Sequence, residues 1–175
     1  MKVIIPMAGL GSRFTNTGIK VPKPLINIYG KYMIEWAIKN VVDLTYSELI
    51  FIILKEHDDN FELSSKLLRL NIPKAKIVIL DKVTQGQLET VLAAKDILQT
   101  EEDLLISPTD TYVISNIKSA IESRSSNCAG IISVINKKGN QWSFAKIDKS
   151  NRVTAVVEKQ RISSLASTGI YYFSN

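Results

Sequence analysis

Apolar runs of strand length recur along the chain, and turn residues bound each of them. Their uninterrupted apolar character predicts strands that are buried on both faces, as in a parallel sheet. We expect these strands at Val3–Met7, Leu49–Leu54, Ile77–Leu80, Leu104–Ile106 and Gly130–Ile135.

Between these runs, apolar residues recur at the spacing of a helix, which predicts helices with one buried face. The stripes consist of Met33, Ile34, Ala37, Ile38, Val41 and Val42; then Phe61, Leu63, Leu67, Leu68 and Leu70; then Leu88, Val91, Leu92, Ile97 and Leu98; and finally Ile117, Ala120 and Ile121. Strand and helix therefore alternate. This order predicts an α/β fold with a mostly parallel sheet, covered on both faces by helices in right-handed crossovers.

The pattern changes after about residue 136. Strands are expected at Ser143–Asp148 and Arg152–Lys159, on either side of the turn residues Lys149–Asn151, and a further strand at Thr168–Phe173. Strands joined by so short a turn pair antiparallel. We therefore expect an antiparallel C-terminal part on the sheet of a single domain.

Composition narrows the class of protein. Hydrophobic residues make up 45% and charged residues 22%, which excludes a disordered or fibrous chain. The longest apolar run, Leu49–Leu54, is far shorter than the ~20 residues that cross a bilayer, so we expect no signal peptide and no membrane span. One cysteine, Cys128, and one histidine, His57, exclude an internal disulfide framework and a histidine-rich metal site. A cytoplasmic location is the expectation that follows.

The charge of the chain favours an anionic partner. The net charge is +5, but the 22 basic residues are spread along the sequence without long runs. This distribution favours a small anionic ligand over nucleic acid, for which aromatic residues interleaved with arginine and lysine are typical.

The segment after the first expected strand carries closely spaced glycines. In open α/β sheets, ligands bind outside the carboxyl ends of the strands. Gly9 and Gly11 allow backbone N–H groups to converge on an anion there, and Arg13 offers a bidentate grip on phosphate. Phe14 occupies the position of the third glycine of the dinucleotide fingerprint, and no Walker motif occurs, which disfavours the two commonest nucleotide loops.

A second unusual segment has one lysine between two prolines, Pro22-Lys23-Pro24-Leu25. The prolines fix the backbone on both sides and limit where the ammonium group of Lys23 points. The order G-x-G-x-R, then P-K-P-L, then Gly30-Lys31 before a helix resembles the nucleotidyltransferase family that makes nucleoside-diphosphate sugars, the sugar-nucleotide pyrophosphorylases.

Further segments extend this resemblance from Met1 to about Phe173. Gln85–Ala94 is similar to the family's Q-G-T-A-x-A-V-x-A-A segment, whose glutamine and glycine recognise the base. Asp110 matches the aspartate that binds magnesium at the end of a strand, and Glu158-Lys159 matches the pair that contacts the acceptor and its phosphate. The resemblance implies a single Rossmann-like three-layer domain with a mixed, mostly parallel sheet.

The reaction that the resemblance implies is attack by a phosphate oxygen of a phosphorylated acceptor on the α-phosphorus of an NTP, with release of pyrophosphate. A phosphate monoester has a second pKa of about 6, so this nucleophile needs no general base. The implied partners are an NTP and a small phosphorylated acceptor, in cell-surface polysaccharide or related biosynthesis, without nucleic acid or membrane. A homo-oligomer is left open.

The resemblance also implies a role for each matching residue. Arg13 and Lys23 are the expected catalytic residues, and Asp110 is the expected ligand of Mg²⁺. The expected nucleotide-binding residues are Ala8, Gly9, Leu10, Gly11, Ser12, Gln85 and Gly86, and the expected acceptor-binding residues are Trp142, Glu158, Lys159 and Gly169.

Departures from the family pattern keep alternatives open. Hexose-specific members carry a Tyr-Gly-like pair and an asparagine where this chain has Trp142–Ala145 and Ala166–Gly169, so the acceptor is either a sugar-1-phosphate or a small non-hexose phosphate. The family takes a second magnesium ligand from beyond its final strands, and we expect that part to be missing from a sequence that ends at Asn175. A nucleotide-binding module with little turnover is therefore the alternative. An NAD-dependent oxidoreductase is disfavoured by Phe14.

The remaining conspicuous residues are expected to be structural. His57 lies at a polar helix start that Asp58 is expected to cap, which is favoured over a catalytic serine–histidine pair or a metal pair at Asp58 and Asp59. Cys128 is expected to fill the core, and Trp36 to be structural.

Overall fold

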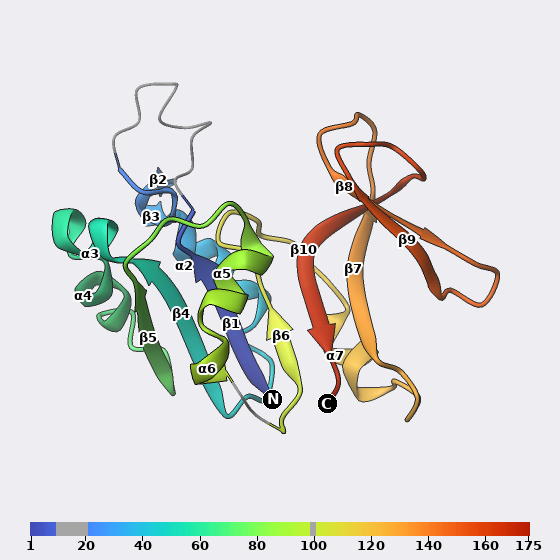
Figure 1. The fold of residues 1–175 in the computed structure, drawn as a ribbon, viewed down its shortest axis with the longest axis horizontal. Helices are drawn as coiled ribbons and strands as arrows, with labels where there is room; N and C mark the ends of the chain where they lie inside the picture. Colours follow the sequence, from blue (N-terminus) through green and yellow to red (C-terminus); the bar gives the residue numbers. More distant parts are fainter. Residues whose placement is uncertain (10–20, 99–100) are drawn as a thin grey trace.

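The computed structural model describes residues 1–9, 21–98 and 101–175. One mixed sheet forms the centre of the molecule, and helices lie on its two faces (Figure 1). The strands of this sheet are β1 (Lys2–Met7), β4 (Glu48–Leu54), β5 (Ala75–Leu80), β6 (Leu104–Ile106), β7 (Gly130–Asn136), β8 (Ser143–Ile147), β9 (Val153–Glu158) and β10 (Leu165–Phe173).

The helices are short. They are η1 (Lys23–Leu25), α2 (Met33–Ala37), η2 (Ile38–Asn40), α3 (Lys55–Phe61), α4 (Leu63–Leu68), α5 (Gln87–Ala93), α6 (Lys95–Leu98) and α7 (Ile117–Glu122). A small hairpin of β2 (Asn27–Ile28) and β3 (Lys31–Tyr32) precedes α2 and turns at Tyr29 and Gly30, which both have positive φ. Within the part of the chain that the structure describes, every helix is too short or too polar to cross a membrane.

The sheet has a parallel half and an antiparallel half. Its order is β5-β4-β1-β6-β10-β8-β9, with β7 paired to β10. Strands β5, β4, β1 and β6 run parallel, and β10 runs antiparallel to β6 and to β7. The predicted α/β fold, with a mixed sheet and an antiparallel C-terminal part, is confirmed.

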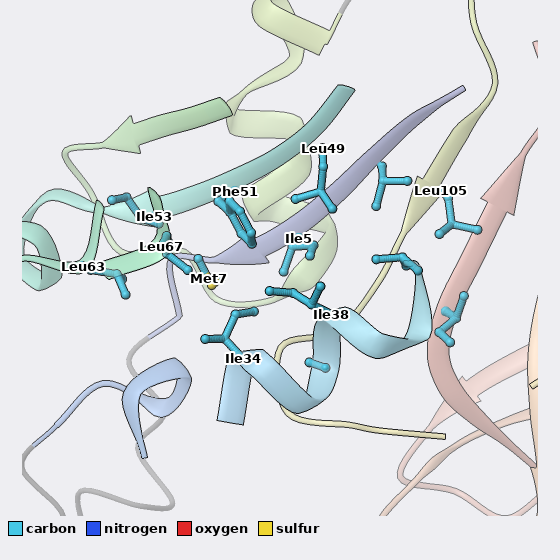
Figure 2. Close-up of a cluster of buried hydrophobic side chains, with 14 of the residues drawn as sticks. Ile5, Met7, Ile34, Ile38, Leu49, Phe51, Ile53, Leu63, Leu67 and Leu105 are labelled. Carbon is cyan, nitrogen blue, oxygen red and sulfur yellow. The ribbon is translucent and has the colours of Figure 1, made fainter. Parts of the chain in front are cut away.

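Alternate residues of the parallel strands point into two separate cores. Val3, Ile5 and Met7 of β1 pack with Phe51 of β4 against α2, η2, α4 and α7, as Figure 2 shows for the labelled members of this cluster. Ile4 of β1 instead joins the cluster on the opposite face, beneath α5 and α6. The period of two along each buried strand therefore builds three layers from continuous apolar runs.

One strand and several helices differ from the sequence prediction. Gly130–Ile135 was predicted to be buried, but β7 pairs only along β10 among the described strands and its residues are half-buried or exposed. An apolar run carries no information on strand direction, which explains this error. The second helical stripe is divided at Glu62, whose φ of 52° ends α3 before α4 begins. Leu68, Leu88 and Leu92 are exposed because only one narrow face of each short helix meets the sheet, and Val42 is exposed in the turn after η2.

His57 lies near the start of a helix as expected, whereas the structural roles expected for Asp58 and Cys128 need correction. Asp58 Oδ1 accepts a hydrogen bond from the backbone N–H of Ser64 at 2.8 Å, so it serves the first turn of α4. Among the described residues, no side chain caps α3. His57 is buried, and burial lowers its pKa against the opposing effect of the Glu56 charge. Cys128 is only half-buried in the turn before β7, so it does not fill the core.

Candidate active site

Lys23 and Asp110 meet at the carboxyl edge of the parallel strands. Lys23 begins η1 and is flanked by the buried Pro22 and Pro24, which anchor the backbone on both sides as predicted. Asp110 lies in the loop that follows β6. The Nζ atom of Lys23 donates to Oδ2 of Asp110 at 2.6 Å, and the two side chains are 26% and 36% exposed. Two residues of opposite charge from distant segments therefore form an ion pair that solvent reaches.

The loop after β1 lies beside the loop after β5. Ala8 is fully buried, and its carbonyl oxygen accepts a hydrogen bond from the backbone N–H of Thr84 at 3.4 Å. Gly9 follows and is exposed. The other residues expected to bind triphosphate lie outside the described residues: Leu10, Gly11, Ser12 and Arg13.

The segment that leads into α5 is held by side chains of its own helix. The backbone N–H of Gln85 donates to Glu89 Oε2 at 2.7 Å, and Thr90 Oγ1 donates to the Gly86 carbonyl oxygen at 3.0 Å. Gly86 has an extended backbone, and no described atom lies within 4 Å of the Cβ that another residue would have there. Packing of the described protein therefore does not require glycine at this position, whereas close approach of a ligand would.

A hollow of about 410 Å³ adjoins this segment. It lies between the residues that follow β5, including Asp81 and Thr84, and Glu89 of α5. Its place beyond the carboxyl end of β5 is where ligands bind in open α/β sheets.

Three of the expected acceptor-binding residues come together at one end of the β8–β9 ribbon. The backbone N–H of Lys159 donates to the Trp142 carbonyl oxygen at 2.9 Å, and Lys159 has a φ of 54°. Its Nζ lies 2.8 Å from Glu158 Oε1, and both side chains are largely exposed. The Nε1 atom of Trp142 is buried, with no hydrogen-bond partner among the described residues.

Gly169 lies at an irregularity in β10. Its φ is +84°, and a Cβ there would come within 3.2 Å of Pro108, in the loop that carries Asp110. Its backbone N–H donates to Ser167 Oγ at 3.1 Å, and its carbonyl oxygen accepts from Gln87 Nε2 at 3.1 Å. Both backbone groups are thus engaged within the protein, so Gly169 shapes this part of the site through its missing side chain.

The sequence that carries these loops matches a known family over almost its whole length. The family model for nucleotidyl transferase matches residues 2–175. The chain belongs to the nucleotidyl transferase family. The resemblance to the sugar-nucleotide pyrophosphorylases that the loop motifs indicate is confirmed.

The individual relatives that match this chain have low sequence identity to it. It is 34% identical over 88 residues to a UTP–glucose-1-phosphate uridylyltransferase of Bacillus subtilis, an alignment that covers 49% of this chain and 30% of the relative. A nucleoside-diphosphate-sugar pyrophosphorylase structure from Vibrio cholerae is 29% identical, with a TM-score of 0.79 over 98% of this chain and 72% of the other. An inositol-1-phosphate CTP transferase from T. maritima, 17% identical, has the same fold with a TM-score of 0.79 over 99% of this chain and 70% of the other.

The described donor set suits a cation that takes some of its ligands from a bound phosphate compound. Across residues 1–9, 21–98 and 101–175, no three acidic, histidine or cysteine side chains gather into a metal cage. Asp110 provides a single accessible carboxylate at the edge of the sheet. Because Mg²⁺ prefers oxygen ligands and is commonly held by one or two carboxylates together with substrate phosphates, this carboxylate suits it.

Sequence reasoning missed several residues that position the site. Glu89 stands three residues after the helix N-cap Gly86, the spacing of a capping box, which could have been recognised although its carboxylate accepts from the N–H of Gln85 instead of the N-cap. Gln87 replaces the threonine of the family segment, and nothing in the sequence indicates that it bonds Gly169 in β10. Asn40 likewise contacts a loop that is more than 70 residues away, so no local pattern reports it.

Proposed function

We propose that this nucleotidyl transferase moves an NMP group from an NTP to a sugar-1-phosphate or another small phosphorylated acceptor and releases pyrophosphate. The observation that carries the proposal is the 2.6 Å contact between Lys23 and Asp110 at the carboxyl edge of the sheet. Phosphoryl transfer needs a positive group beside the transferring phosphoryl group, which Lys23 can provide. It also needs a carboxylate that holds the metal ion, which Asp110 can provide.

Lys23 acts on the α-phosphoryl group in this proposal. Its ammonium group leaves Asp110 when the triphosphate enters, because the polyanion offers it more negative charge than one carboxylate. The flanking Pro22 and Pro24 hold the backbone while the side chain moves. The acceptor phosphate is already mostly dianionic at neutral pH, so the attack needs no general base.

Asp110 is the proposed ligand of Mg²⁺, shared with the phosphates of the NTP. The cation would supply neutralisation of the charge that develops on the phosphoryl oxygens. In the nucleotide loop, Gly9 and the residues up to Arg13 would bind the triphosphate, while Gln85 and Gly86 would contact the base beside the hollow at the end of β5.

Lys159 is the proposed partner of the acceptor phosphate. It is exposed, Glu158 lies beside it and its backbone is bonded to that of Trp142, so a cation and a carboxylate are available to one small phosphorylated molecule. The names of the relatives from Bacillus subtilis and Vibrio cholerae support a sugar phosphate as the first acceptor to test. The cytoplasm, where NTPs and sugar phosphates are made, is the proposed location.

A pyrophosphate-release assay tests the proposal. ATP, CTP, GTP, UTP and dTTP are each paired with hexose-1-phosphates and with small amino-alcohol phosphates in the presence of Mg²⁺. We expect release with at least one pair, and its loss in Asp110→Asn. NTP binding without release from any pair would contradict the proposal and favour a nucleotide-binding module.

A further inference from the structure

Asn40 is a buried polar residue that contacts the loop carrying Asp110. It ends η2 and is 9% exposed. Its Nδ2 donates to the Thr111 carbonyl oxygen at 2.6 Å, and its Oδ1 accepts from the backbone N–H of Val113 at 3.0 Å. One amide group thus satisfies a donor and an acceptor of the backbone directly after Asp110.

The residue between these two hydrogen bonds is held by the same helical segment. The ring of Tyr112 lies 6.1 Å from the ring of Trp36, measured between centroids. Lys39 Nζ lies 4.2 Å from the centroid of Trp36 and 5.8 Å from that of Tyr112. Residues 111–113 are therefore attached to α2 and η2 at three consecutive positions.

The same helical segment also supports Lys23. The backbone N–H of Met33, the first residue of α2, donates to the Ile26 carbonyl oxygen at 2.8 Å, directly after η1. Leu25 of η1 and Met33 are both buried. The continuous segment α2–η2 thus holds the lysine of the ion pair near its start and the loop of the aspartate at its end.

We propose that Asn40 is a positioning residue that sets the Asp110 carboxylate opposite Lys23, and thereby sets the geometry in which Mg²⁺ and NTP are bound. The proposal rests on the proposed function of Asp110. Asparagine suits this position because it donates and accepts at once. An apolar residue would leave the two partly buried backbone groups of the loop without this partner, and aspartate would lose the donor to Thr111.

The test compares Asn40→Ala with Tyr172→Phe. The control removes the 2.6 Å hydrogen bond from the buried Tyr172 to Asp103, at the opposite end of β6, so it lowers stability without touching the Asp110 loop. We expect Asn40→Ala to raise the Mg²⁺ concentration for half-maximal turnover and to lower kcat, each by about 10-fold, as is typical of residues that orient metal ligands. The KM for NTP should change less, and Tyr172→Phe should leave all three values near wild type.

A second variant and a second readout keep the test decisive. Asn40→Asp has the same volume and keeps the Val113 hydrogen bond, so it replaces Asn40→Ala should that variant fail to fold. Mg²⁺-dependent binding of UTP, CTP, ATP and GTP, measured by calorimetry, reports positioning without turnover. Weaker Mg²⁺-dependent binding in the Asn40 variant supports the proposal even where wild type releases no pyrophosphate. Equal Mg²⁺ dependence in wild type, the Asn40 variant and Tyr172→Phe overturns it.

Discussion

The two ends of β6 each carry an aspartate with charged and polar partners, and the partners differ in kind. Asp103, directly before β6, accepts from Tyr172 Oη at 2.6 Å, from Arg124 at 3.0 Å and from the backbone N–H of Asn175 at 3.1 Å. Asp110, beyond the other end, accepts from the lysine ammonium of Lys23 and from the Thr111 hydroxyl at 3.4 Å.

The roles we assign to the two aspartates differ accordingly: Asp103 serves stability, and Asp110 is proposed to serve chemistry. The Tyr172 hydrogen bond, helped by the Asn175 N–H and the Arg124 charge, holds the pKa of Asp103 below its ordinary value. These donors come from Tyr172 of β10, from Arg124 just after α7 and from Asn175, so together they fasten the amino edge of the sheet. Asp110 instead faces a flexible lysine at an accessible edge, where a polyanion can separate the two charges.

The largest expected effect is on catalysis, at Lys23. Lys23→Met keeps the length of the side chain and removes the charge that we propose acts on the α-phosphoryl group, so kcat should fall by about 10²-fold or more. The KM for NTP should change less, because the contact strengthens in the transition state. Steady-state kinetics of pyrophosphate release check this. Unchanged kcat with weak NTP binding would mean that Lys23 only binds the NTP in its ground state. It would contradict the catalytic role that separates the Asp110 end of β6 from the Asp103 end.

The next effect is on stability, at Asp103. Asp103→Ala leaves the buried Tyr172 hydroxyl and the Arg124 guanidinium without this partner, so the free energy of unfolding should fall by about 2 kcal/mol. Denaturant unfolding measures the change, and Tyr172→Phe, which removes one of the contacts, should lose about half as much. A variant as stable as wild type would show that the amino edge does not depend on this cluster.

A smaller effect is expected where β10 passes the Asp110 loop. Gly169→Ala must adopt a positive φ and push against Pro108, which should lower the free energy of unfolding by about 1 kcal/mol. Because the displaced strand lies on the proposed acceptor side, the KM for acceptor should rise more than the KM for NTP. Kinetics with each substrate varied in turn measure the two KM values separately. Equal changes in both KM values would contradict the separate placement of acceptor and NTP.

The smallest effect is on pH dependence. Because the pKa of Asp103 is lower in the folded chain than in the unfolded one, its contribution to stability is present above about pH 4 and is lost as the pH falls through the folded pKa. Burial and the Asp103 hydrogen bond raise the pKa of Tyr172 from 10.0 to about 12, so its contribution is lost as the pH rises from 10 toward 12. Unfolding of wild type and Asp103→Ala should therefore converge at low pH. A constant difference between them from pH 7 to pH 2 would contradict this.

The parallel half of the sheet was the most predictable part of the molecule. Leu49–Leu54 and Leu104–Ile106 differ by at most one residue from the observed strands, because fully buried strands must be apolar at every position. Helix lengths were less predictable, since apolar residues such as Leu88 and Leu92 continue a stripe on a face that meets no sheet. The direction of β7 depends on its pairing with β10, which local sequence does not encode.

The placement of the candidate site residues was predictable from the rule that ligands bind at the carboxyl ends of parallel strands, whereas the tertiary contacts around them were not. Asp110 and Lys23 both follow parallel strands, whose carboxyl ends share an edge, and the structure brings them together. The hydrogen bonds from Asn40 to Thr111 and from Gln87 to Gly169 join segments that are 71 and 82 residues apart. Only the folded arrangement of helix and loop produces these contacts.

The most direct test of the account measures turnover and melting temperature together in Asp110→Asn and Asp103→Ala. Asp110→Asn keeps the shape of the side chain and removes the charge of a hard-cation ligand, so turnover should fall by about 10²-fold while the melting temperature stays near that of wild type. Asp103→Ala should melt earlier and keep wild-type turnover below its transition. The account is contradicted if Asp110→Asn melts as early as Asp103→Ala, or if it retains the turnover of wild type.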